Sequence, residues 1–306
     1  MEPPRVNLGS PWLFFCVVLS WSWLFWIPMA VLDISIQTSL GRGLELVGLL
    51  GPALGGIGLA YLTQNREGWR DYWSRVVDPR RIPLVWYPII LFFAPVLWTG
   101  AVLLDVLVGG SAAPELIGQR LDFFRSVPSS IAPFVLLVLV NGPVPEELGW
   151  RGYVLGRLQE RRNVLISSLI LGTVWALFHL PLFYIKDTFH ADRGAWSAWF
   201  WLFMLQIVAA SFIFTWIFNN TRHSTLAAIL LHFAINLTAE LVNRTERTNL
   251  FATLLWIVAA AVAAALMGVR TPPGDRRRLD ARQPFAARSG SNPHAATSCA
   301  NGQRGD

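Results

Sequence analysis

Eight long apolar runs constrain this chain more than any other feature of its sequence. Each has roughly the twenty residues that a helix needs to cross the hydrocarbon core of a bilayer, and within lipid only helices and closed barrels satisfy every backbone polar group. The runs cover residues 11–32, 44–63, 84–108, 131–154, 164–185, 196–218, 224–242 and 250–269. Residues 1–270 are therefore predicted to form one domain, an all-α, polytopic membrane helix bundle of about eight transmembrane helices.

The composition excludes several other classes of protein. Hydrophobic residues make up 54% of the chain and charged residues only 14%, whereas soluble globular chains carry about 25% charged residues. Two cysteines, Cys16 and Cys299, are too few for a disulfide framework. The basic side chains lie between apolar runs and no nucleic-acid-binding motif surrounds them. We therefore expect the lipid bilayer as a partner, and no nucleic acid.

The distribution of basic residues predicts the orientation in the membrane. A cytoplasmic N-terminus places 18 of the 25 Lys and Arg residues on the cytoplasmic side, and positive charge is enriched there. The residues left on the other side are Arg42, Arg120, Arg125, Lys186, Arg193, Arg244 and Arg247. Both termini are therefore predicted to be cytoplasmic. The preference for Arg over Lys fits a GC-rich bacterial gene, which makes a bacterial inner membrane the expected location.

Two polar segments stand apart from the apolar runs. Residues 271–306 are rich in Arg, Ala, Ser, Gly and Pro and have almost nothing to bury, which is typical of a disordered, basic cytoplasmic tail. Residues 68–82 mix Trp, Tyr and Val with arginine. This pattern fits an amphipathic helix at the membrane interface, with a solvated loop as the alternative.

Three of the apolar runs hold nearly all the polar groups that would lie inside the membrane. Such groups are costly in lipid, so each is a candidate functional residue. They are Glu146, Glu147, Arg151, His179, His232 and Asn236. Glu147 and Arg151 are four residues apart and can pair on one helical face, while Glu146 is rotated by about 100° and is free to face a cavity. His232 and Asn236 share a face for the same reason.

Two prolines precede the glutamates and predict a break in the fourth run. Pro143 and Pro145 cannot continue a helix from before them, but proline suits the first turn of a new helix. We expect a break at residues 141–145 and a fresh helix that carries Glu146 and Glu147 in its first turn. The helix dipole favours acidic side chains at that position.

These residue types suit hydrolysis of an amide bond. Glu146 would deprotonate a water molecule, His232 and Asn236 would donate hydrogen bonds to the oxyanion, and His179 would orient the water or protonate the leaving amine. Equally, Glu146, His179 and His232 are a three-ligand set for a catalytic Zn²⁺ with one open position. The sequence leaves both mechanisms open. No HExxH motif is present, which excludes the helical zinc-protease arrangement. No GxSxG motif is present either, which argues against a serine mechanism.

An ion-coupled membrane transporter is the alternative function. A helix that is interrupted by proline and carries buried Glu, Arg and His is also found in ion-coupled carriers. Against this interpretation, the second half of the chain shows no corresponding broken segment.

The order of the motifs resembles a known family. Glu146, Glu147 and Arg151 form EExxxR, Trp175 and His179 form an aromatic-xxx-His, and His232 and Asn236 form HxxxN. In that order, on successive membrane helices, they resemble the CPBP family of CAAX-protease and bacteriocin-processing intramembrane endopeptidases, also called Abi. The resemblance covers about residues 131–242.

The resemblance implies more than the residues alone predict. It implies a catalytic cavity that opens to the cytoplasm, a glutamate-activated water that is often described as metal-dependent, and a peptide or membrane-associated protein as substrate. By position, Glu146 would be the base and Glu147 and Arg151 would support it. His179, His232 and Asn236 would complete the site. Trp175 departs from the phenylalanine of the family motif, and a larger aromatic ring there would narrow the cavity.

Overall fold

The computed structural model describes residues 7–110, 119–242 and 245–269, and every regular element in these ranges is helical. The longer α-helices are α1 (Pro11–Val31), α2 (Ser39–Leu49), α3 (Gly51–Thr63), α4 (Arg66–Val77), α5 (Trp86–Leu107), α7 (Ile131–Val140), α10 (Val164–Phe178), α12 (Ala198–Asn220), α13 (Thr225–Leu241) and α14 (Glu246–Val269). The shorter ones are α6 (Gln119–Ser126), α8 (Pro143–Gly149), α9 (Leu155–Gln159) and α11 (Phe189–Arg193). The predicted tail at 271–306 lies outside the described residues.

The helix bundle confirms the prediction of a multi-pass membrane fold. Among the described residues, 7 helical segments are long and apolar enough to span a bilayer. They are Pro11–Val31, Ser39–Thr63, Trp86–Leu107, Pro128–Gln159, Val164–Tyr184, Ala198–Asn220 and Glu246–Gly268. The remaining predicted run forms α13, an apolar helix of 17 residues. This shorter helix carries His232 and Asn236.

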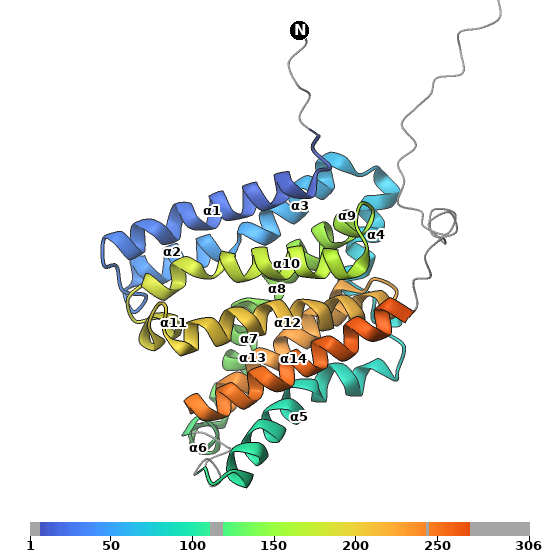
Figure 1. Cartoon of the computed structure of the whole chain (residues 1–306). Helices are drawn as coiled ribbons and strands as arrows, with labels where there is room; N and C mark the ends of the chain where they lie inside the picture. The colour runs from blue at the N-terminus through green and yellow to red at the C-terminus, as the bar shows by residue number, and fades with distance from the viewer. Residues whose placement is uncertain (1–6, 111–118, 243–244, 270–306) are drawn as a thin grey trace, which may run out of the picture. The chain divides into compact units, whose positions relative to one another are not determined.

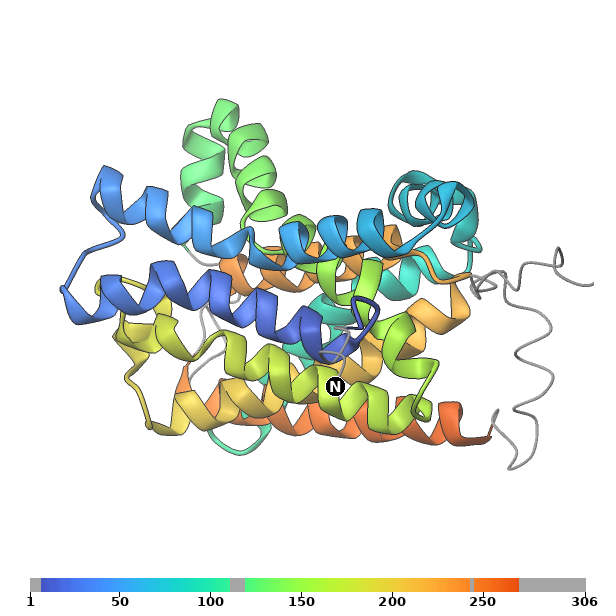
Figure 2. The same ribbon diagram turned by 90° about the horizontal axis from the view of Figure 1, so that it is seen from above.

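Helix α8 lies at the centre of the bundle. It packs against α3 on one side and against α13 on another, while α12 lies between α10 and α14, and α5 contacts α13 and α14 (Figure 1). Helix α7, which leads into α8, projects from the bundle (Figure 2) and buries only Val138. The candidate site residues therefore lie on well-packed helices, next to a loosely packed one.

The predicted break before the glutamates is present. Helix α7 ends at Val140, and Gly142 adopts φ +134°, a value that side-chain-bearing residues rarely adopt. Helix α8 then begins at Pro143, inside the predicted break, and places Glu146 in its first turn. Glu147 was expected in the same turn but lies just beyond it, because the helix already begins at Pro143. Proline fits there because the first helical N–H has no partner within the helix.

Close contacts between backbones fix the position of α8. A β-carbon on Gly149 would lie 2.3 Å from the carbonyl oxygen of Pro52, and one on Gly56 would lie 2.6 Å from that of Leu148. Because neither neighbour is a flexible side chain, both positions require glycine. Helix α3 and helix α8 therefore meet backbone to backbone.

A π-helical segment, η3 (Trp150–Val154), continues α8, and α4 holds it in place. The Tyr72 hydroxyl donates to the carbonyl of Leu148 at 2.9 Å, and Arg75 Nη2 donates to that of Gly152 at 3.0 Å. Burial raises the pKa of the Tyr72 hydroxyl, so it remains a donor at neutral pH. Residues 68–82 thus form a helix followed by a short 3₁₀ segment, as the helical alternative predicted, and their placement at an interface stays a prediction.

The connections between the spans meet at two opposite ends of the bundle. At one end, Arg81 donates to the carbonyl of Arg222 at 3.0 Å, which joins the segment after α4 to the α12–α13 turn. At the other end, Lys186 pairs with Asp33 at 3.0 Å, which joins the α1–α2 connection to the segment before α11. Helix α1 begins and α14 ends at the first of these ends (Figure 1).

Candidate active site

Glu146 is buried and accepts two hydrogen bonds from tryptophans. Its side chain Oε2 accepts from the indole Nε1 of Trp150 at 3.3 Å and from that of Trp175 at 2.5 Å, and only 4% of the residue is exposed. Trp150 lies four residues along the same helical path, whereas Trp175 reaches across from α10. The two indoles hold one carboxylate oxygen and leave Oε1 for other partners.

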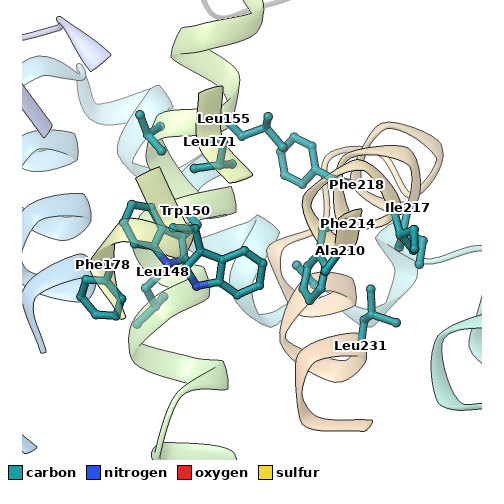
Figure 3. Close-up of a cluster of buried hydrophobic side chains, with 14 of the residues drawn as sticks. Leu148, Trp150, Leu155, Leu171, Phe178, Ala210, Phe214, Ile217, Phe218 and Leu231 are labelled. Carbon is teal, nitrogen blue, oxygen red and sulfur yellow. The ribbon is translucent and has the colours of Figure 1, made fainter. Parts of the chain in front are cut away.

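Trp150 is itself held by the apolar core behind the site. Its ring lies 5.7 Å from that of Phe178 in an edge-on arrangement, within a cluster that includes Phe214, Leu155 and Leu171 (Figure 3). The indole is fully buried. The donor to Glu146 is therefore fixed by packing.

Glu147 pairs with Arg151, as the spacing predicted. Arg151 Nη1 lies 3.0 Å from both carboxylate oxygens, and neither side chain is exposed. His232 Nδ1 lies 2.9 Å from Glu147 Oε1, a contact that the sequence did not predict. The Arg151 guanidinium also lies over the rings of Trp175 and Phe214, at 4.5 Å and 4.1 Å from their centroids. Glu147 thus links helix α8 to helix α13.

The partners of the two histidines define which ring nitrogen carries a proton. His179 Nδ1 lies 2.8 Å from the carbonyl oxygen of Trp175, which can only accept. The carboxylate of Glu147, which pairs with Arg151, is likewise an acceptor for His232 Nδ1. In its neutral form, each imidazole would therefore carry its proton on Nδ1 and present an unprotonated Nε2. This differs from the expectation that neutral His232 donates to an oxyanion.

A cavity of about 510 Å³ adjoins four of the six predicted residues. Glu146, His179, His232 and Asn236 line it, whereas Glu147 and Arg151 lie behind its wall. The wall includes the aromatic residues Trp26, Trp98, Trp175, Phe178, Phe203, Phe214 and Trp256. Four of the residues predicted from the sequence thus line the cavity, and the predicted ion pair lies behind them.

Polar atoms from α8 and α13 converge beside Gly142. A β-carbon on this glycine would lie 3.2 Å from Asn236 Nδ2, 3.6 Å from Glu146 Oε1 and 3.7 Å from His232 Nε2. The missing side chain leaves a small space bordered by a carboxylate, an unprotonated imidazole nitrogen and an amide donor. Sequence analysis did not identify Gly142, although its position directly before Pro143 marks the turn that needs a positive φ.

Three other contributors to the site were also missed. Trp150, Phe214 and the hydrogen-bonding role of Trp175 appear only in the structure. The i,i+4 spacing of Glu146 and Trp150 was a usable signal. Nothing in the sequence indicates the contacts that come from other helices.

The zinc hypothesis requires three ligands around one point. No group of three His, Cys, Asp or Glu side chains within the described ranges is placed to hold a metal ion. The free atoms Glu146 Oε1, His179 Nε2 and His232 Nε2 are of the type that zinc prefers, and each Nδ1 has the kind of partner that orients a ligand. Their placement in the described part of the chain nevertheless does not fit a three-ligand site.

Comparison with known proteins gives two matches. Residues 128–238 match the family described as type II CAAX prenyl endopeptidase Rce1-like. All six predicted site residues lie within that range. The chain is also 30% identical, over 256 residues, to the CAAX prenyl protease 2 of Methanococcus maripaludis. That alignment covers 83% of this chain and 93% of the relative.

Proposed function

The chain belongs to the Rce1-like family of type II CAAX prenyl endopeptidases, and from this premise we propose that it hydrolyses a peptide bond with a water molecule activated by Glu146. The observation that carries the proposal is the convergence of Glu146 Oε1, His232 Nε2 and Asn236 Nδ2 beside Gly142. The family relationship favours an intramembrane protease over the transporter alternative.

The proposed reaction needs one base, one donor and one water. Glu146 Oε1 takes a proton from the water as its oxygen attacks the carbonyl carbon of the substrate. The amide of Asn236 donates to the oxyanion that forms. Glu146 then passes the proton to the departing amine, so the carboxylate is restored when the C–N bond breaks.

The histidines act as acceptors in this scheme. With Nδ1–H directed at fixed acceptors, His179 and His232 both present Nε2 as an acceptor. Because Glu146 takes one of the two hydrogens of the attacking water, a single Nε2 accepts the other, and His232 Nε2 borders the space beside Gly142. Glu147 orients His232, and Arg151 neutralises Glu147. The ion pair thus supports the proposed site without lining the cavity.

The function is tested by offering peptides to the purified protein in detergent. The probes are a peptide library, a farnesylated peptide that ends in a CAAX sequence, and the same peptide without the farnesyl group. Mass spectrometry of the products identifies any cleaved bond. We expect cleavage by the wild-type protein that is absent with Glu146→Gln. Failure to cleave every probe, or equal cleavage by the variant, would contradict the proposal.

Trp175→Phe is expected to lower the cleavage rate while leaving the fold intact. Phenylalanine restores the family motif but removes the indole N–H that donates to Glu146. A hydrogen bond to a charged group contributes about 1.5–3 kcal/mol, so the loss in kcat is about 10- to 100-fold if the bond positions the base in the transition state. Trp256→Phe is the matched control, because Trp256 lines the same cavity and has no contact with Glu146 among the described interactions. Equal rates for the two variants would show that the indole of Trp175 only fills space.

Cleavage is expected to survive removal of divalent metals. The reason is the placement of the candidate ligands, which do not surround one point in the described part of the chain. The test combines elemental analysis of the purified protein with cleavage assays before and after chelation. Stoichiometric zinc that disappears in His179→Ala/His232→Ala, together with activity that only added zinc restores, would establish a metal-dependent reaction instead.

A further inference from the structure

Gln206 on α12 lines the cavity but has no part in the proposed reaction. The described residues of α12 that line the cavity recur at helical spacing, on one side of the helix, and are Phe203, Gln206, Ile207, Ala210 and Phe214. Gln206 carries the one polar side chain among these five. A polar side chain within a membrane-spanning helix is costly, which makes it a candidate functional group.

The amide nitrogen of Gln206 is held by two residues of α14, which packs along α12 (Figure 1). Nε2 donates to Thr253 Oγ1 at 2.7 Å and to Asn249 Oδ1 at 3.0 Å. Thr253 and Asn249 are each 1% exposed, and neither lines the cavity. Both hydrogens of the Gln206 amide are therefore used inside the protein, on the side away from the cavity.

The hydroxyl of Thr253 determines how the Gln206 amide is oriented. Its one hydrogen is donated to the backbone carbonyl of Asn249 at 2.8 Å, so Oγ1 can only accept from Gln206. Gln206 must then direct Nε2, and not its carbonyl oxygen, at Thr253. The carbonyl oxygen, Oε1, has no hydrogen-bond partner among the described residues. The group that Gln206 offers to the cavity is therefore an acceptor.

Gln206 lies close to the groups of the proposed reaction. One turn before it, the ring of Phe203 is 5.3 Å from that of His179. Two turns after it, the ring of Phe214 is 5.8 Å from that of His232. At about 1.5 Å per residue, these two positions are about 4.5 Å and about 12 Å from Gln206 along the helix. Because an extended peptide advances about 3.3 Å per residue, Gln206 lies within about four peptide residues of the bond to be hydrolysed.

We propose that Gln206 Oε1 accepts a hydrogen bond from one backbone N–H of the bound peptide, and that this bond sets which peptide bond lies beside Glu146. The inference rests on the proposed peptidase function. A peptide in the cavity removes its backbone donors from water, and each donor left unpaired there costs free energy. The preferred substrate is then a peptide with a free N–H at one fixed distance from the cleaved bond. Proline has no N–H and is disfavoured at that position.

Peptide binding tests this hydrogen bond without requiring cleavage. Full-length Glu146→Gln in detergent is mixed with the peptide library and the two CAAX peptides used for cleavage, and mass spectrometry identifies the peptide that it retains most tightly. This peptide, carrying a fluorescent label, is the probe. Its backbone amides are then replaced one at a time by esters, each of which removes one N–H. Dissociation constants are measured by fluorescence anisotropy for Glu146→Gln and for Glu146→Gln/Gln206→Met.

Gln206→Met is expected to weaken binding of the probe by about 10-fold, because one N–H of the peptide loses its acceptor. One ester should cause the same loss when Gln206 is present and no further loss when Met replaces it. Ser211→Ala is the matched control in the same background. Its hydroxyl joins α12 to α10 by donating to the carbonyl of Ser168 at 2.9 Å, but Ser211 does not line the cavity. This control should leave the dissociation constant unchanged.

Three results would overturn the proposal. They are unchanged binding with Gln206→Met, ester effects that persist in full in that variant, and failure of the parent variant to retain any peptide. Equal weakening by Ser211→Ala would also overturn it, because Gln206 would then act only by joining helices. Cleavage by the wild-type protein is measured separately on the same peptides. A protein that binds as expected but cleaves no peptide would contradict the peptidase assignment and still support the hydrogen bond.

Discussion

Glu146→Gln is expected to reduce peptide cleavage by about 10³-fold with little change in thermal stability. A positioned general base contributes about 10²- to 10⁴-fold to a rate, and an amide cannot take the proton from water. Glutamine has nearly the same size and keeps an oxygen that can accept from Trp150 and Trp175. The variant therefore removes the proton acceptor and preserves the packing around it.

The matched control for this variant is Glu45→Gln. Glu45 lines the same cavity but lies on α2, where it pairs with Arg42. Cleavage close to the wild-type rate is expected, because this carboxylate does not border the space beside Gly142. Rates are measured with one peptide probe, and unfolding midpoints are measured in the same detergent. Normal turnover by Glu146→Gln would remove Glu146 from the reaction.

Arg151→Met is expected to destabilise the protein by about 3–5 kcal/mol, the cost of stranding a buried charge. The variant leaves Glu147 fully buried, with His232 as its remaining hydrogen-bond partner. Because methionine fills much of the volume of arginine, the expected loss of stability comes mainly from the unpaired charge of Glu147 and not from a cavity. Activity is expected to fall as well, because the pair orients His232. The measurement is the free energy of unfolding by denaturant titration.

Two comparisons identify the cause of that destabilisation. Arg42→Met breaks an ion pair whose arginine side chain is 48% exposed, so a loss below about 1 kcal/mol is expected. The double variant Glu147→Gln/Arg151→Met strands no charge and should be more stable than Arg151→Met alone. Equal losses for Arg151→Met and Arg42→Met would contradict a buried charge pair.

Local geometry explains which parts of the site the sequence could predict. The Glu147–Arg151 pair and the helix break before Glu146 depend on residues within a few positions of one another, where helical spacing and proline chemistry apply. The contact between Glu147 and His232 spans 85 residues and depends on how α8 and α13 pack. A single sequence contains no pattern from which this contact between two distant helices could be predicted.

In the fold, too, the sequence predicted local features better than the details of individual helices. The apolar runs predicted the membrane helices because their length reflects the thickness of the bilayer. The run at 44–63 nevertheless forms two helices, since α2 ends at Leu49 and α3 begins at Gly51. Pro52 in that run was a usable signal, because proline favours a first helical turn. The π-helical turn after Gly149 had no such signal.

The weak packing of α7 has a mechanical consequence. This helix forms part of the cavity wall through Phe134, Leu137 and Val138, yet Val138 is the one residue of α7 that is buried. Helix α8 cannot yield in the same way, because its backbone abuts that of α3. A bound peptide would therefore displace α7, and the movement would turn about Gly142, the residue around which the proposed reacting groups gather. Binding of the substrate and alignment of the groups that hydrolyse it would then occur in a single movement of α7 about Gly142.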